Sequence, residues 1–151
     1  MGGVQFRRFK KADALRVVRL IRKVSNEFNR KEGTKEGNQY FFSLYMPSKV
    51  TAWTKDYCIL AEYKGKLLGL GRAKQNGWIT HCYVRKSQMG KGFGKELMLK
   101  MERWLYLKEH RKVFLNSSLF AHKFYKKLGY KDISHVKTYH GLRMNPMNKR
   151  L

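Results

Sequence analysis

Apolar residues recur every three or four positions in two long stretches of the chain, which is the pattern of an amphipathic helix. The first stretch follows Asp13, and its apolar positions are Val17, Leu20, Ile21, Val24 and Phe28. The second follows a glycine-rich segment, and its apolar positions are Leu97, Met98, Met101, Trp104 and Leu105. Shorter apolar stretches at 39–46 and 119–128 predict two more helices, stopped by Pro47 and Gly129. The polar, glycine-containing stretch 29–38 predicts a loop.

Alternating and continuous apolar runs predict the strands. Lys64-Gly65 and Asn76-Gly77 separate three such runs, so an antiparallel meander is expected there. The predicted strands are 4–9, 57–63, 66–73, 78–85, 112–118, 130–136 and 137–144. Helices and strands therefore follow one another in the order β-α-α-β-β-β-α-β-α-β-β, and the sequence predicts an α/β (α+β) fold.

Length and composition favour a single domain over residues 1–151. The chain is 42% hydrophobic and 14% aromatic, as expected of a globular protein. It contains no secretory signal and no run close to the ~18 apolar residues of a membrane span. Cys58 and Cys82 lie in apolar runs and are too few for a disulfide framework or a zinc site. We expect a cytoplasmic protein with reduced cysteines, no metal and no membrane partner.

Charge is the unusual feature of the composition. The 34 Lys and Arg against 10 Asp and Glu give a formal net charge of +24 and a pI of about 10.3. Such a chain attracts anions, including nucleic acids and phosphate-bearing cofactors, and repels polycationic substrates. The basic residues are dispersed along the sequence, which is also the pattern of a solvated surface.

The segment 87–97, SQMGKGFGKEL, places three glycines ahead of the second long helix. A glycine turn at a helix N-terminus presents free backbone N–H groups and the positive end of the helix dipole to an anion, typically phosphate. The Walker A motif is excluded because Glu96 stands where a Ser or Thr is needed, and the dinucleotide motif is excluded because Lys95 stands where a glycine is needed. A turn that uses glycine only for positive φ is the alternative.

The sequence CYVRKSQMGKGFGKELM, residues 82–98, resembles the acetyl-CoA pyrophosphate loop of the GNAT-type N-acetyltransferases, Arg/Gln-x-x-Gly-x-Gly/Ala. Gly92 and Gly94 take the two small positions. Met89 stands at the Arg/Gln position, with Gln88 one residue early, but that position binds mainly through its backbone in the family.

A second motif, LNSSLFAHKFYKKLGY at 115–130, is similar to the other signature of that family, Asn-x-x-Ala-x-x-Phe-Tyr-x-x-x-Gly-Phe. Ser118 replaces the Asn, and the matching residues are Ala121, Phe124, Tyr125, Gly129 and Tyr130. The resemblance covers nearly the whole chain. It implies the GNAT fold, with a central mixed, mostly antiparallel sheet of six to seven strands flanked by helices.

The resemblance also implies a reaction, the direct transfer of acetyl from acetyl-CoA to a primary amine in a ternary complex. The strand at 78–85 would splay from the strand at 113–116 and leave a gap for the pantetheine arm. The cofactor-binding residues implied are Cys82, Tyr83, Val84, Met89, Gly90, Lys91, Gly92, Phe93, Gly94, Lys95, Ser118, Phe124 and Tyr125. The acceptor would be a small molecule, a protein N-terminus or lysine, or an aminoacyl group on RNA, and a homodimer remains open.

Tyr125 stands where the family places the general acid that protonates the departing thiolate, although packing in the core is the alternative role. The base is less defined, because Trp78 and Thr80 occupy the positions at which members carry Glu or His. Glu27 and Glu32 lie near the end of the first helix and are the candidates. A strongly positive site would also lower the pKa of the amine.

An RNA- or ribosome-binding regulatory module on the same fold, with little catalysis, is the alternative function that the charge supports. A DNA-binding helix-turn-helix over 13–46 is disfavoured, because the stretch 29–38 is too long for the tight turn of that motif.

Overall fold

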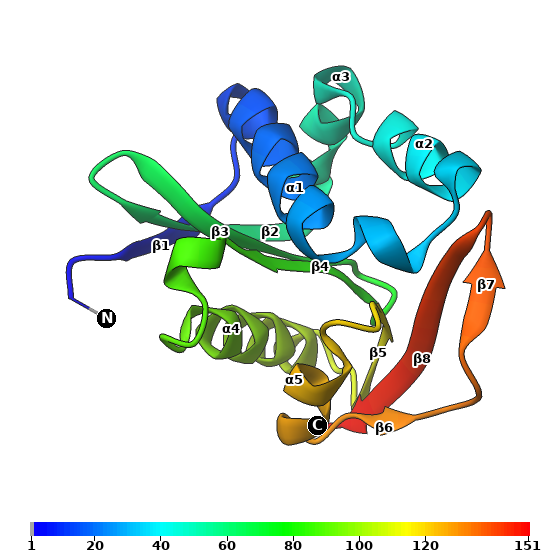
Figure 1. Cartoon of the computed structure of the whole chain (residues 1–151). Coiled ribbons are helices and arrows are strands. Elements are labelled where there is room, and N and C mark those ends of the chain that lie inside the picture. Colours follow the sequence, from blue (N-terminus) through cyan, green and yellow to red (C-terminus); the bar gives the residue numbers. More distant parts are fainter. Residues whose placement is uncertain (1) are drawn as a thin grey trace.

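Helices cover both faces of an antiparallel sheet in the computed structural model, which describes residues 2–151 (Figure 1). The helices are α1 (Ala14–Phe28), α2 (Lys35–Ser43), α3 (Pro47–Val50), α4 (Phe93–Leu107) and α5 (His122–Lys127). The strands are β1 (Gln5–Arg8), β2 (Tyr57–Tyr63), β3 (Lys66–Ala73), β4 (Ile79–Val84), β5 (Lys112–Ser117), β6 (Lys131–Asp132), β7 (Lys137–Tyr139) and β8 (Leu142–Arg150). Within residues 2–151, no helix combines the length and the apolar character that a bilayer span requires.

The two amphipathic stripes read from the sequence form the two halves of the core. Val17, Leu20 and Ile21 of α1 are fully buried against one face of β2 and β3, together with Leu60 and Leu70. Residues Leu97, Met98 and Met101 of α4 pack on the opposite face, together with Ile59 and Val84. Alternation along β2 sends Ile59 to one core and Leu60 to the other. The sheet is therefore apolar on both faces, as the continuous runs predict.

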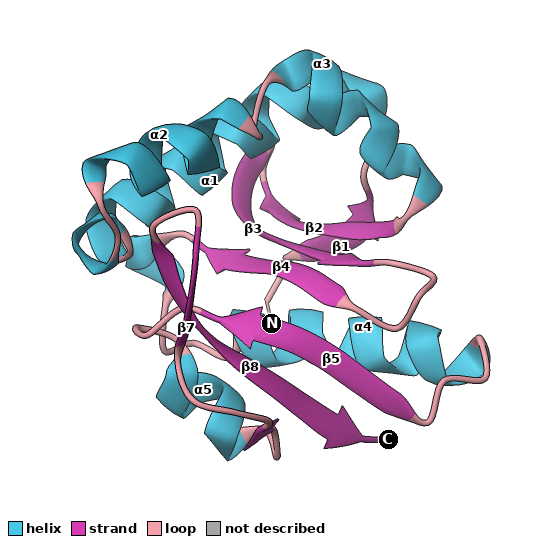
Figure 2. Cartoon of the chain, turned by 90° about the vertical axis from the view of Figure 1, so that its right-hand side faces the viewer, coloured by secondary structure: helices cyan, strands magenta, loops and turns pink. Residues whose placement is uncertain are grey.

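The strands described for residues 2–151 fall into two groups of four. The first group is ordered β1-β2-β3-β4, and in the second β8 pairs with β5, β6 and β7. The two groups meet at one parallel bridge between Trp78 and Phe114, where Phe114 N donates to Gly77 O at 3.1 Å. Within residues 2–151 no further ladder joins β4 to β5, which lie side by side in Figure 2. This is the gap that the family resemblance implies.

Some boundaries differ from those predicted. Helix α2 begins at Lys35, inside the expected loop, because Thr34 Oγ1 accepts a hydrogen bond from Gly37 N at 3.0 Å and caps it. Helix α2 ends at Ser43, before the Pro47 that was expected to stop it, and Pro47 is instead the first residue of α3.

The end of the chain also differs from the prediction. The segment expected as one strand at 137–144 is a hairpin that turns at His140 and Gly141, whose φ angles are 49° and 77°. Only two residues of the expected strand 130–136 form a ladder. The expected six to seven strands are therefore eight in the described part of the chain.

Candidate active site

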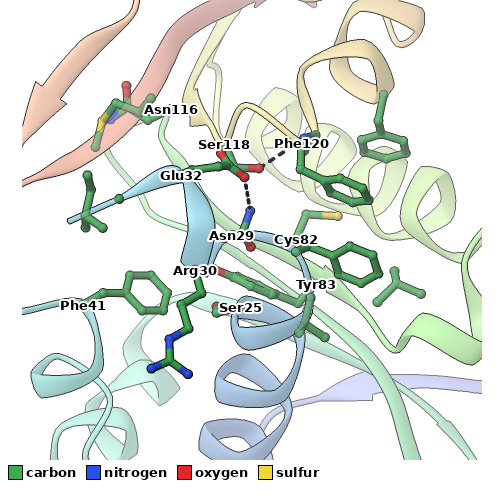
Figure 3. Close-up of a pocket in the computed structure, with 18 of the residues that line it drawn as sticks. Ser25, Asn29, Arg30, Glu32, Phe41, Cys82, Tyr83, Asn116, Ser118 and Phe120 are labelled. Atoms are coloured by element: carbon green, nitrogen blue, oxygen red, sulfur yellow. Dashed lines mark hydrogen bonds between the residues drawn. The ribbon is translucent and has the colours of Figure 1, made fainter. Parts of the chain in front are cut away.

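A cavity of about 650 Å³ opens where β4 and β5 separate. Its walls come from the end of α1, the α1–α2 connection, β4, the glycine turn before α4, the β5–α5 loop and the β7–β8 hairpin (Figure 3). Of the residues expected to bind the cofactor, those that line this cavity are Cys82, Tyr83, Val84, Met89, Gly90, Gly92, Gly94, Lys95, Ser118, Phe124 and Tyr125.

The glycine turn exposes backbone at one end of the cavity. Gly90 and Gly92 have φ angles of 78° and 92°, in the left-handed region that favours glycine, and Gly92 is the N-cap of α4. The first N–H of α4 to bond back is that of Glu96, to Gly92 O at 3.0 Å, so the preceding N–H groups have no partner in the helix. A Cβ on Gly94 would lie 3.1 Å from the ring of Phe124, so glycine also allows α5 to approach. The turn therefore offers donors and positive dipole to an anion.

Two expected residues of the turn keep their side chains out of the cavity. Phe93 is buried in the core beneath α4, and Lys91 Nζ donates to Gln88 Oε1 at 3.3 Å. Neither side chain lines the cavity. Any contribution from them to a ligand would come from the backbone.

Cys82 and Tyr83, which line the gap between β4 and β5, are neutral at physiological pH. Burial raises the pKa of Cys82 to about 12, and its Sγ lies 3.7 Å from Gly94 O, so this thiol is a poor nucleophile. Burial also raises the pKa of Tyr83 to about 12, with the nearby Ser25 hydroxyl opposing the shift. Cys58 is free and buried in the core, as expected, whereas Cys82 is only partly buried because it faces the cavity.

Tyr125 packs in the core and also lines the cavity. Its ring packs edge-on against Tyr130, with centroids 5.8 Å apart, and the residue is only 8% exposed. It also lines the cavity, and within residues 2–151 no group hydrogen-bonds its hydroxyl. Burial raises the pKa of Tyr125 well above 10, so the hydroxyl keeps its proton at neutral pH. It can therefore donate this proton to a group in the cavity.

The structure separates the two glutamates. Glu32 lines the cavity, where its Oε1 accepts from Leu119 N at 2.6 Å. Its Oε2 accepts from Asn29 Nδ2 at 3.1 Å (Figure 3). Glu27 is exposed on α1, pairs with Lys23 at 3.4 Å and does not line the cavity. Of the two candidates, only Glu32 lines the cavity.

Several cavity residues were missed by sequence reasoning. Phe28 and Phe120 both line the cavity and stack on each other, with ring centroids 4.4 Å apart. Ser25 Oγ is buried without a hydrogen-bond partner among the described residues. Aromatic residues at the end of a helical stripe are as typical of a protein core as of a ligand cavity. The sequence therefore did not mark either phenylalanine as part of the site.

The outer wall of the cavity is held by a close backbone contact between α2 and the β7–β8 hairpin. Thr34 N donates to Gly141 O at 3.0 Å, and Arg143 Nε donates to Glu32 O at 2.7 Å. A Cβ on Gly37 would lie 2.7 Å from the carbonyl of Gly141, so only glycine fits there. This contact ties the segment carrying Glu32 to the end of the chain.

The described part of the chain contains no candidate metal site. Between residues 2 and 151, no group of three or more His, Cys, Asp or Glu side chains is arranged to hold a metal ion.

A protein-family model described as the acetyltransferase (GNAT) domain matches residues 29–151. The chain belongs to the GNAT family. The resemblance given by the two motifs is thus confirmed. A comparison with curated protein sequences returns no match.

Solved GNAT structures share the fold. A GCN5-related N-acetyltransferase of Rhodopseudomonas palustris has 19% identity and a TM-score of 0.81, over 100% of this chain and 98% of that chain. The PaiA N-acetyltransferase of Thermoplasma acidophilum, in complex with coenzyme A, has 18% identity and a TM-score of 0.82, over 98% of this chain and 99% of that chain. Aminoglycoside 6'-acetyltransferase type Ii has 16% identity and a TM-score of 0.71, over 97% and 96%. The predicted mixed α/β GNAT fold is confirmed.

Proposed function

We propose that the protein is an N-acetyltransferase that moves the acetyl group of acetyl-CoA directly to a primary amine while both are bound. One observation carries the proposal: a single cavity joins the bare backbone of the glycine turn to the Tyr125 hydroxyl, at the gap between β4 and β5. The first feature suits a pyrophosphate and the second suits a departing thiolate.

The residues present fit the cofactor. The N–H groups at the start of α4 would bind the pyrophosphate, with charge from Lys95, which lines the cavity. β4 pairs only with β3 beyond Trp78, so backbone groups from Cys82 to Val84 on its other side are available to the amides of the pantetheine arm. Cofactor binding supplies an activated acetyl thioester to the gap.

The reaction forms a C–N bond between the amine and the acetyl carbonyl carbon and breaks the C–S bond. Tyr125 would donate its proton to the leaving sulfur, which becomes the thiol of coenzyme A. The amine must lose a proton, and we assign Glu32 to accept it directly or through water, because Glu27 lies outside the cavity. No acetyl-cysteine is needed, since Cys82 is held as an unreactive thiol.

The test joins acetyl-CoA calorimetry to a thiol-release assay over a panel of amines. Tyr125→Phe should lower kcat by roughly 10²- to 10⁴-fold, the usual contribution of a general acid, while acetyl-CoA affinity stays within about twofold. The matched control is Tyr130→Phe, which also removes a buried hydroxyl, here one that donates to Glu102 at 2.8 Å, and should keep kcat.

Two results would overturn the proposal. Wild-type protein that shows no acetyl-CoA binding between micromolar and millimolar concentrations contradicts it. If that protein instead binds RNA with steep salt dependence and acetylates no amine, the RNA- or ribosome-binding alternative takes its place. Full activity of Tyr125→Phe would refute the acid assignment alone.

A further inference from the structure

A second cavity, of about 400 Å³, adjoins the first on the side of the β4–β5 bridge. The two cavities share four lining residues, Leu44, Tyr45, Thr80 and Asn116. Asn116 thus lines both spaces, and none of the residues from 2 to 151 hydrogen-bonds its side chain. A molecule whose amine lies in the first cavity can therefore extend into the second.

The charged groups that line the second cavity are cationic. They are Arg72 and Lys74, and among residues 2–151 no carboxylate lines this cavity. Arg72 is already compensated, because its Nε and Nη2 lie 2.8 and 2.7 Å from Asp56 Oδ2, and its guanidinium also lies over the ring of Trp53. The ammonium of Lys74 has no carboxylate within 4.0 Å in the described chain. Lys74 is therefore the uncompensated charge of this cavity.

His81 adds no charge to the second cavity. Its Nε2 lies 2.7 Å from the Tyr45 hydroxyl and its Nδ1 lies 2.8 Å from Thr80 Oγ1, so both ring nitrogens are engaged. Burial lowers the pKa of His81 to about 3, with Arg72 acting in the same direction, so the ring is neutral at physiological pH. It lines the cavity as a fixed polar wall.

Building on the proposed acetyl transfer, we propose that the second cavity binds an anionic group, a carboxylate or a phosphate, carried by the acceptor amine. Lys74 contacts the anion, and the Asn116 amide donates to the same molecule. Glu32, on the first cavity, meets the amine end. The carboxylate of Glu32 and the ammonium of Lys74 carry opposite charges and orient the acceptor, and Lys74 repels a polycationic amine such as an aminoglycoside.

Paired amines that differ only in the anionic group test this assignment. Phenylalanine is compared with phenethylamine for a carboxylate, and phosphoethanolamine with ethanolamine for a phosphate. Wild-type kcat/KM should be at least about tenfold higher for the anionic member of at least one pair, and the pair that shows it identifies the anion. Lys74→Gln should remove the preference and Lys74→Glu should reverse it. Lys66→Gln, at the exposed other end of β3, is the matched control and should keep it.

A second readout separates this proposal from the acetyltransferase proposal. The same amines are titrated into protein saturated with coenzyme A, where binding is measured without turnover. If acetyl-CoA binds but neither readout prefers an anion, or if Lys74→Gln keeps the preference, the anion subsite is refuted and the acetyltransferase stands. If acetyl-CoA does not bind, the acetyltransferase falls, and the binding preference and its loss in Lys74→Gln decide the second cavity alone.

Discussion

A glutamate in place of Gly90 should weaken acetyl-CoA binding, whereas the same change at Gly65 should not. The two glycines are matched in conformation, because their φ angles are 78° and 77° and a Cβ at either would meet nothing within 4 Å. They differ in place, since Gly90 lines the cavity and Gly65 lies in the turn between β2 and β3. A side chain in this conformation costs about 1–2 kcal/mol at either site. Both variants should therefore lose similar free energy of unfolding.

The effect on binding comes from charge. Two unit charges 4 Å apart repel by about 1 kcal/mol in water and about 4 kcal/mol at the effective dielectric constant of a protein surface. At about 1.4 kcal/mol per tenfold, one such contact between the introduced carboxylate and a pyrophosphate charge weakens acetyl-CoA binding by about fivefold to about a thousandfold. The neutral Gly90→Gln variant has the same size and should lose much less. The gap between the two should narrow as salt is added.

Calorimetry with acetyl-CoA at two ionic strengths measures these differences, and chemical denaturation measures the shared loss of stability. Wild-type affinity in Gly90→Glu would refute the placement of the pyrophosphate at this turn. Equal losses in Gly90→Glu and Gly90→Gln would refute the electrostatic explanation. An equal loss of affinity in Gly65→Glu would show that the strain, and not the site, is responsible.

Three further changes test the surroundings of the site. Gly37→Ala should lower the melting temperature, although alanine favours helices, because its Cβ would meet the Gly141 carbonyl at 2.7 Å; a raised melting temperature in thermal denaturation contradicts this contact. Between its ordinary pKa of 6.5 and its folded pKa of about 3, His81 binds a proton only when unfolded, so the free energy of unfolding should fall by up to about 1.4 kcal/mol per pH unit on acidification. Urea titrations at several pH values should show a smaller change in the free energy of unfolding per pH unit for His81→Gln. An unchanged pH dependence counts against a buried neutral ring. Glu32→Gln should lower kcat/KM in the thiol-release assay while Glu27→Gln leaves it unchanged, and equal effects contradict the assignment of Glu32.

Short-range sequence patterns predicted much of the fold and part of the candidate site. The stripes of α1 and α4 are fixed by helical spacing, and the glycine turn and Tyr125 each belong to a short contiguous motif. Such features depend on neighbours a few residues away, which the sequence displays directly. The turn at His140 and Gly141 is the exception, because a short apolar run gives no sign of where its strand reverses.

The choice between the two glutamates depends on contacts that the sequence does not display. Lys23 and Glu27 stand four residues apart and form a solvated ion pair on α1. Glu32 is drawn inward by the N–H of Leu119 and by Arg143, both distant in the chain. The part of the site that the sequence left undecided is thus the part built from long-range contacts.

The structure places part of the excess positive charge in the walls of the two cavities. The sequence alone did not decide whether the net charge of +24 belongs to a solvated surface or to an anion-binding site. The charged residues lining the first cavity are Arg30, Lys95 and Arg143 against the single carboxylate of Glu32, and those lining the second are Arg72 and Lys74. Cations in a confined space stabilise a bound pyrophosphate and destabilise an ammonium beside it, which lowers the pKa of the amine. The same excess of positive charge that would hold the cofactor therefore favours the uncharged amine that the reaction needs.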